Sequence, residues 1–156
     1  MGWSYMRAKD AISGTEGTLY ATIDGEVVPI AECKSFSAKI TKNKSDFKAL
    51  GYRGVQHKAT GWSGTGEMTL YFATSRFVKM MINYAKTGKD DYFKLQATNE
   101  DPSSSIGKQT VTIMEVNLDE ADIAKLNTES EFLDQSMSFT FSDVEMPEEF
   151  DAINAE

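Results

Sequence analysis

The chain has 156 residues, of which 16 are basic and 24 acidic, and its formal net charge is −8. This length suits one domain with its own core, and the negative charge argues against a free nucleic-acid binder, which needs a cationic surface to displace phosphate counterions. The single cysteine, Cys33, excludes an internal disulfide. No apolar run approaches the roughly 20 residues that cross a bilayer, so we expect no membrane partner.

Alternation of apolar and polar residues, which is typical of half-buried β-strands, dominates the chain. Residues 18–23 and 26–30 flank Asp24 and Gly25, a pair that tolerates positive φ, and the pattern predicts a β-hairpin. Pro29 cannot donate to a ladder, which places the second strand at a sheet edge. Further strands are predicted over residues 34–41, 68–72, 93–98, 111–118 and 136–141. The apolar parity switches within 111–118, which indicates a bulge or a crossing between sheets.

One helix is predicted after Thr74 or Ser75, either of which can cap it, and before Gly88, a typical stop. Its apolar stripe consists of Phe77, Met80, Met81, Tyr84 and Ala85. A weaker helical turn is expected over 119–126. Many strands with antiparallel-type turns and one helix predict a mainly β fold, a β-sandwich or barrel of antiparallel strands with one flanking α-helix.

Two stretches lack strand or helix periodicity. Residues 43–65 are rich in Gly and Lys and predict a long polar loop, which at this length is usually functional. Residues from about 145 to 156 predict a flexible acidic tail on a single domain spanning 1–156. Charge is segregated, with +5 over 31–62 and −12 over 115–156. Such segments can meet within one monomer or between neighbouring copies, and contact between neighbours is head-to-tail and closes rings or extends filaments.

Candidate catalytic residues are few. His57 is the only histidine, and residues 61–65 (GWSGT) depart from a nucleophile elbow by ending in Thr. Glu67 stands where a phosphate-binding loop needs Lys. Cys33 and His57 together supply at most two zinc ligands, fewer than a zinc site needs. We therefore expect no catalytic, metal-binding or cofactor-binding residue and no cofactor.

Trp62 is the most informative single residue of the Gly-rich stretch. A large aromatic side chain there either folds back on its own chain or is buried in a partner, and the residue alone leaves both readings open. The length of the predicted loop favours the partner, because interface anchors are enriched in Trp.

The order of several short motifs along the chain resembles the tail tube proteins of contractile-tailed phages, and in particular the tail core proteins of PBSX-like defective prophages. The matching segments are 12–17 (ISGTEG), 24–25 (DG), 50–54 (LGYRG), 57–61 (HKATG), 87–89 (TGK), 98–102 (TNEDP), 107–111 (GKQTV) and 138–141 (SFTF). They cover nearly the whole chain in order, except the acidic end after Met146.

The resemblance implies a structural protein without catalysis. Subunits of this family form hexameric rings that stack into a tube inside a contractile sheath, with tape-measure and sheath proteins as partners. The tube is a conduit for DNA or an effector, without sequence-specific nucleic-acid binding. The implied location is the virion tail, assembled in the bacterial cytoplasm.

The residues expected at subunit or inter-ring contacts all lie in the predicted loop. They are Lys44, Lys48, Arg53, His57, Lys58 and Trp62. Two alternative functions stay open at this point. A type VI secretion-like tube subunit shares the ring architecture, and a small-molecule-binding β-barrel would explain strands and aromatics without assembly.

Overall fold

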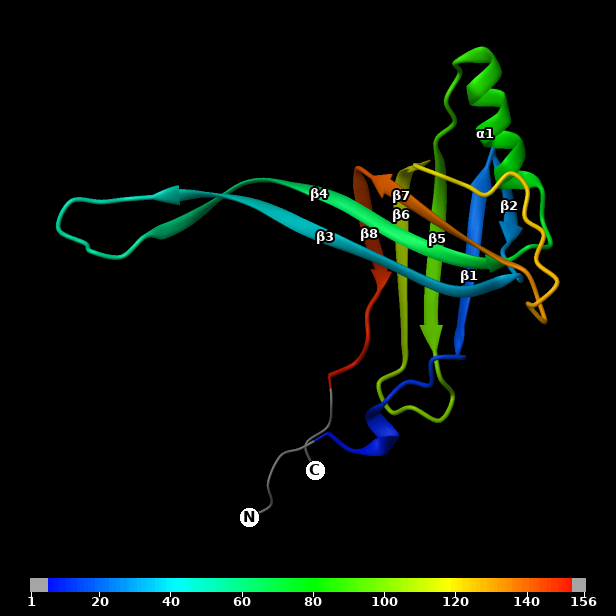
Figure 1. The fold of residues 1–156 in the computed structure, drawn as a ribbon. Helices are drawn as coiled ribbons and strands as arrows, with labels where there is room; N and C mark the ends of the chain where they lie inside the picture. Colours follow the sequence, from blue (N-terminus) through cyan, green and yellow to red (C-terminus); the bar gives the residue numbers. More distant parts are fainter. Residues whose placement is uncertain (1–5, 153–156) are drawn as a thin grey trace. The chain divides into compact units, whose positions relative to one another are not determined.

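The computed structural model describes residues 6–152 (Figure 1). The chain divides into two units. The first unit holds the residues up to Ala31, then Tyr92–Val116 and the residues from Asp143, and the second unit holds Glu32–Asp91 and Asn117–Ser142. Within the described range, all strand pairings are antiparallel and one α-helix is present, which confirms the predicted mainly β class. None of the helices described is both long and apolar enough to span a membrane.

The first unit is built on a sheet with the strand order β2-β1-β5-β6-β8. The elements are a 3-10 helix η1 (Ala8–Asp10), β1 (Gly17–Ile23), β2 (Glu26–Pro29), β5 (Phe93–Glu100), β6 (Lys108–Leu118) and β8 (Asp143–Glu148). Asp24 and Gly25 have φ angles of 53° and 79° and connect β1 to β2, which confirms the predicted hairpin. The edge position predicted from Pro29 is confirmed as well, because β2 pairs only with β1.

A bulge interrupts β6 where the sequence switches its apolar parity. Leu95 pairs with Ile113 and Phe93 pairs with Val116, so β6 gains one residue over β5. Glu115, within the bulge, has a φ of 56°. The bulge allows both Ile113 and Val116 to be buried although they differ in parity.

The prediction of an unstructured tail from about residue 145 is wrong for residues 145–148, because these belong to β8. Thr112 pairs with Glu145, and Thr110 pairs with Glu148. The Nζ of Lys108 lies 3.4 Å from Glu148 Oε1. Four of the predicted tail residues, 153–156, lie outside the described residues.

The second unit contains a sheet with the order β7-β4-β3. Its elements are β3 (Cys33–Phe47), β4 (Gln56–Tyr71), α1 (Arg76–Thr87) and β7 (Asp134–Phe141). The last two residues of β6, Asn117 and Leu118, pair with Thr140 and Phe139 of β7. The predicted helix is confirmed as α1, and it ends at Gly88, which has a φ of 74° and donates its N–H to the Tyr84 carbonyl.

Glycines of β4 make room for phenylalanines of β7 on the buried face of this sheet. Gly64 pairs with Phe141 and Gly66 pairs with Phe139. A Cβ atom on Gly66 would lie 2.4 Å from the Phe139 ring and 2.6 Å from the Ser37 carbonyl oxygen. The Phe139 ring also stacks on Phe36 with centroids 5.8 Å apart. The phenylalanine rings of β7 therefore fit only because the residues opposite them on β4 are glycines.

Two further predictions differ from the structure. Residues 43–65 do not form a long loop: only 48–55 lie between β3 and β4, and the other residues belong to these strands. The helical turn predicted over 119–126 is wrong, because residues 119–133, which connect β6 to β7, form neither helix nor strand.

Substitution of Gly66 by Ala is expected to lower the free energy of unfolding by about 1–3 kcal/mol or more, because the Ser37 carbonyl is backbone and cannot move aside cheaply. Gly61→Ala, on the same strand, is the matched control, since the nearest atom to its added Cβ is 4.0 Å away. Urea unfolding of both variants measures the difference. Equal stability of the two would contradict the close packing of Phe139 on β4.

Gln135 gives a second prediction. Its side chain is fully buried on β7, and neither Oε1 nor Nε2 has a hydrogen-bond partner within the part of the chain that the structure describes. Gln135→Met keeps the side-chain size and removes two unsatisfied polar groups, so we expect a gain of about 1–3 kcal/mol in unfolding free energy. The control is Gln96→Met, at an exposed strand position, with no expected gain. A destabilised Gln135→Met variant would show that Gln135 does find a partner.

Candidate functional site

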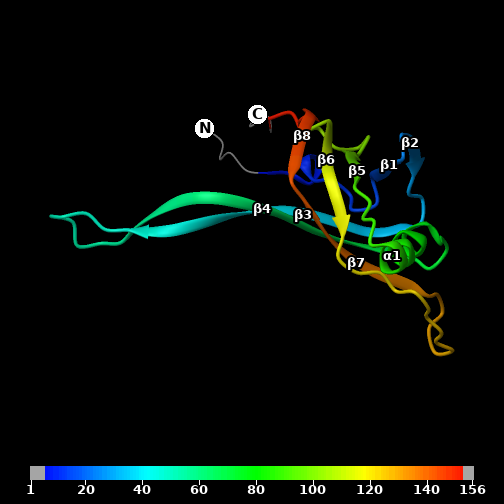
Figure 2. The same cartoon turned by 90° about the horizontal axis from the view of Figure 1, so that it is seen from above.

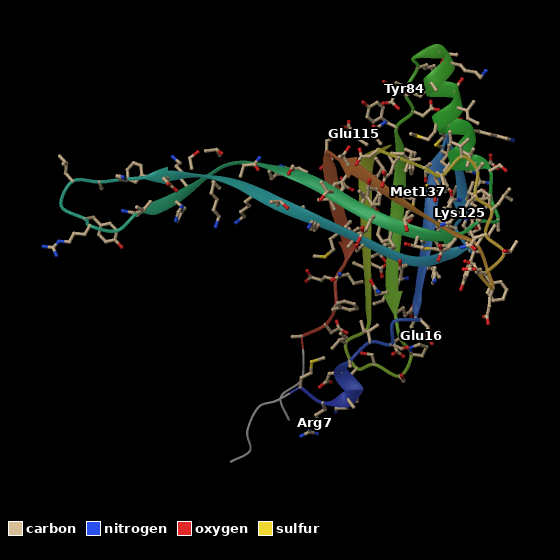
Figure 3. All side chains as sticks on the ribbon, in the orientation of Figure 1. Arg7, Glu16, Tyr84, Glu115, Lys125 and Met137 are labelled. Atoms are coloured by element: carbon tan, nitrogen blue, oxygen red, sulfur yellow. The ribbon has the colours of Figure 1, made fainter. Side chains whose placement is uncertain are left out.

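The β3–β4 hairpin continues well beyond the strand that covers its first part. β4 pairs with β7 only over Gly64–Tyr71, whereas its pairing with β3 reaches Gln56. We call Thr41–Phe47, residues 48–55 and Gln56–Ser63 the arm. Figures 1 and 2 show the arm as a two-stranded ribbon that runs on past β7. In Figure 3 its side chains stand clear of the other elements of the second unit. Both faces of the arm are therefore open.

A bulge within the arm fixes which side chains share a face. The pairing shifts between Asn43 and Lys44, and the Thr60 hydroxyl donates to the Asn43 carbonyl at 3.1 Å. Beyond this point Lys44 pairs with Ala59. Before it Lys42 pairs with Trp62. Trp62 shares a face with Gly64 and Gly66 by the ordinary alternation of β4, and the extra residue, Thr60, shifts the alternation only for the residues of β4 that precede it.

The six predicted interface residues all lie on the arm, but not in one cluster. Lys44 and His57 occupy one face, since Asp46 opposite His57 is two residues from Lys44. Lys58 pairs with Ser45 on the other face. Lys48 and Arg53 belong to the connecting residues at the tip. Trp62 lies at the base. A partner that touched all six would have to surround the arm.

Trp62 is half-exposed and partly folded back on its own unit. Its side chain is 44% exposed, and its ring centroid lies 6.3 Å from that of Phe141. Phe141 is buried. Trp62 therefore packs against the buried face of the sheet at the base of the arm. Nearly half of the residue stays exposed and can contact a partner.

The arm has an excess of positive charge. Its five cationic side chains have no ion-pair partner among residues 6–152: Lys42, Lys44, Lys48, Arg53 and Lys58. Its one acid is Asp46, whose Oδ1 lies 3.0 Å from Nδ1 of His57. With neutral His57 the arm carries a net charge of +4.

Exposed apolar side chains on the arm were not found from the sequence. They are Phe47, Leu50, Tyr52 and Val55, and Ile40 is exposed on β3 just before the arm. The side chain of Leu50 at the tip is fully exposed. The signal available in the sequence was an apolar residue at every second or third position of 47–55 inside a polar stretch. Such uncovered apolar side chains on a protruding element are typical of a surface that a partner covers.

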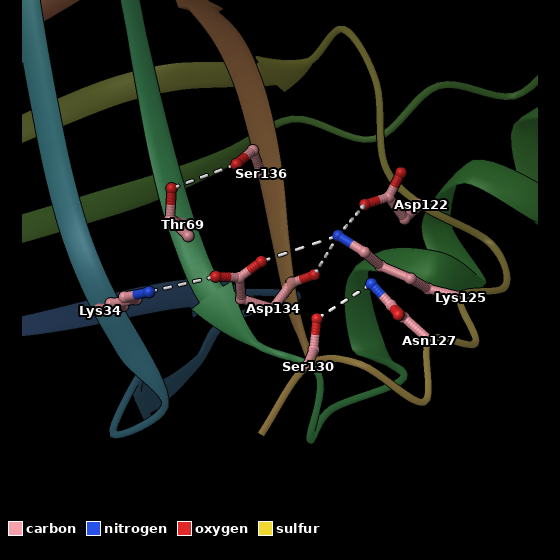
Figure 4. A network of polar contacts seen from close by, with 8 residues as sticks. All are labelled: Lys34, Thr69, Asp122, Lys125, Asn127, Ser130, Asp134 and Ser136. Atoms are coloured by element: carbon pink, nitrogen blue, oxygen red, sulfur yellow. Dashed lines mark hydrogen bonds and ion pairs between the residues drawn. The ribbon is translucent and has the colours of Figure 1, made fainter. Parts of the chain in front are cut away.

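A second exposed surface, the acidic loop, consists of residues 119–133 at the other end of the same sheet. Lys125, its only basic residue, lies 4.0 Å from Asp122 and 3.7 Å from Asp134, and donates to the Asp134 carbonyl at 2.8 Å (Figure 4). Lys34 of β3 contacts the Asp134 carboxylate at 3.2 Å. The hydrogen bond from Lys34, together with the charges of Lys34 and Lys125, holds the pKa of Asp134 below its ordinary value.

The remaining chemistry of the described residues offers no reactive centre. No group of three His, Cys, Asp or Glu side chains in residues 6–152 is arranged to hold a metal ion. Cys33 and His57 lie at opposite ends of the β3–β4 ladder, because Cys33 pairs with Leu70 at one end and His57 pairs with Asp46 near the other. Burial raises the pKa of the Cys33 thiol, which disfavours the reactive thiolate.

Comparison with known proteins gives a consistent result. A family model described as phage tail tube protein matches residues 4–148. Two proteins of Bacillus subtilis strain 168 are similar over 92% of this chain and 95% of their own length. They are the phage-like element PBSX protein XkdM, 46% identical over 143 residues, and the protein YqbM, 45% identical over 144 residues.

Solved structures share the fold at low sequence identity. A chain of the anti-feeding prophage baseplate has a TM-score of 0.67 at 12% identity, covering 90% of this chain and 97% of that one. The SPP1 tail tube gives 0.63 at 13%, with 90% and 81% covered. A chain of the PVC sheath-tube complex, an extracellular contractile injection system, gives 0.61 at 10%, with 82% and 86% covered.

The Asp134 contacts predict an acid-dependent stability. A lowered carboxyl pKa contributes stability that is present above the unfolded-state pKa, near 4, and is lost as the pH falls through the folded-state pKa. Asp134→Asn is therefore expected to destabilise the protein at about pH 6 and to differ less from the unsubstituted chain at about pH 2.5. Urea unfolding at both pH values measures this. Asp119→Asn, which removes no ion pair, is the control. A difference that did not shrink on acidification would contradict the role of the ionised carboxylate.

Proposed function

Because this chain belongs to the phage tail tube protein family, we propose that its copies form hexameric rings that stack into a tube inside a contractile sheath. The protein is a structural tail tube subunit of a phage-like element, and its family is not enzymatic. Two structures with the same fold support the arrangement. One is the anti-feeding prophage baseplate, which is 6-fold symmetrised, and the other is a sheath-tube complex. The sheath and a tape-measure protein are the proposed partners.

The observation that carries this proposal is the uncovered arm. An isolated subunit leaves both faces of a two-stranded ribbon open, with apolar side chains in water and cationic side chains that have no ion-pair partner among residues 6–152. Exposed strands of this kind tend to pair with another chain. We place the subunit contacts at Lys44, Lys48, Arg53, His57, Lys58 and Trp62, and we propose that both units act as one tail-tube domain over residues 1–156.

The cargo of the tube is DNA or an effector. The net charge of −8 opposes tight binding of phosphates, and a wall that does not hold phosphates allows a nucleic acid to slide. The proposed location is the virion tail, with assembly in the bacterial cytoplasm.

Assembly of the purified protein tests the proposal. Negative-stain microscopy of concentrated protein is expected to show rings or tubes. The double variant Leu50→Ser/Tyr52→Ser should keep the melting temperature of the monomer, since both side chains are exposed, and should assemble at least tenfold less well by sedimentation. Tyr92→Ser, at an exposed Tyr outside the arm, is the control. Featureless monomers at high concentration, or normal assembly of the arm variant, would contradict the proposal.

A further inference from the structure

We propose that the arm of one copy docks on the acidic loop, residues 119–133, of a neighbouring copy. This inference rests on the proposed function, because it names the surface that receives the arm during assembly. It is carried by three properties of the second unit: the matched charges of the two surfaces, their exposed apolar side chains, and their positions at opposite ends of one sheet.

The charges of the two surfaces are complementary. The acidic loop carries a net charge of −4, against +4 on the arm. Four of its carboxylates have no ion-pair partner within the described residues: Asp119, Glu120, Glu129 and Glu131. Its one cation, Lys125, is engaged with Asp122 and Asp134 inside the same unit. Each surface thus lacks in its own subunit the counter-charges that the other offers, and such complementarity guides association and fixes its register.

Both surfaces also expose apolar side chains. In the acidic loop these are Ile123, Leu126 and Phe132, and Leu126 is 97% exposed. At the tip of the arm Leu50 is fully exposed, with Tyr52 and Val55 close in sequence. A docked pair would bury apolar side chains in the middle and leave charges around them, which is the usual composition of a protein interface.

The acidic loop is held in place rather than hanging free. The Asp119 N–H donates to the Ser138 carbonyl at 2.9 Å, and the Leu133 carbonyl accepts from the Phe72 N–H at 2.9 Å. The Phe132 ring meets Tyr71 edge-on at 6.4 Å. Lys125 joins the middle of the loop to Asp134 at the start of β7 (Figure 4). A preordered receptor loses less entropy when a partner binds.

The tip of the arm, residues 48–55, cannot reach the β7 end of the acidic loop within one subunit in this structure. The acidic loop leads into Asp134, which pairs with Tyr71 at the last residue of β4. The tip of the arm leads into Gln56, the first residue of β4. The 16 residues of β4 separate these ends by about 50 Å at roughly 3.3 Å per residue. Contact between such surfaces joins different copies head-to-tail, and this kind of contact closes rings or extends filaments.

The other acidic region of the chain fits the arm less well. On β8, Glu148 already contacts Lys108 and accepts from the Thr110 hydroxyl. Met146 is the one large apolar side chain exposed over the described residues 143–152. The acidic loop combines free carboxylates with three exposed apolar side chains, and we therefore choose it as the receptor.

Two charge-reversed variants test the docking. Lys48→Glu/Arg53→Glu/Lys58→Glu changes the arm from +4 to −2, and Glu120→Lys/Glu129→Lys/Glu131→Lys changes the loop from −4 to +2. Each variant alone opposes like charges and should assemble at least tenfold less than the unsubstituted chain by sedimentation. In a 1:1 mixture each contact between the two different variants pairs opposite charges, so assembly with alternating subunits should return. Glu145→Lys/Glu149→Lys/Asp151→Lys, on the other acidic region, is the matched control and should not restore assembly of the arm variant.

A photo-cross-linking amino acid in place of Leu50 gives a second readout. In assembled protein the cross-links are expected in peptides from residues 119–133, and a mixture of 14N- and 15N-labelled subunits shows whether they join different copies. Tubes whose cross-links fall elsewhere, or restoration by the β8-side control, would overturn the inference and leave the proposed function standing. Failure of the unsubstituted chain to assemble would overturn both.

Discussion

The backbone ladder between β3 and β4 is the interaction on which the second unit depends. It pairs Cys33 with Leu70 at one end and Phe47 with Gln56 at the other, without a break beyond two local register shifts. Over its first half, β7 adds a third strand, and the shared face buries Met68, Met137 and Phe139. Over its second half the ladder alone orders the chain. The same hydrogen bonds thus anchor a core and hold an arm that has no core.

The difference between these halves explains what the sequence could and could not predict. The strands with one buried face, such as residues 136–141, show clean alternation and were predicted within two residues. Both faces of the arm are exposed to solvent, so its strands need no alternating apolar residues. From the sequence alone, such a Gly- and Lys-rich strand cannot be told from a loop. Turn chemistry was the more reliable local signal, because Asp24-Gly25 and Gly88 act through φ angles that depend on no distant contact.

The acidic loop shows the opposite error. Ile123 and Leu126 have helical spacing, yet both side chains are exposed and the segment has no regular structure. Periodicity identifies a face only where another element covers it, and no such element covers this one within the described chain. The candidate interface residues were found because the basic stretch is contiguous in sequence. The segregation of charge is visible in the sequence, but the exposed apolar side chains of the arm, and the position of the acidic loop at the other end of the sheet, are visible only in the structure.

Gly64 and Gly66 have a further consequence for how this chain can vary. They fit β4 against Phe141 and Phe139 of β7, so packing outside the arm sets the register of this strand pair. Leu50, Tyr52 and Val55 at the tip are exposed and take no part in that packing, so we expect the length and composition of residues 48–55 to vary without loss of the folded subunit. Selection acts on them only through the particle they build. The tip is thus a site where related elements can diverge until their subunits no longer mix, and where a foreign peptide can be inserted into a still-folded subunit.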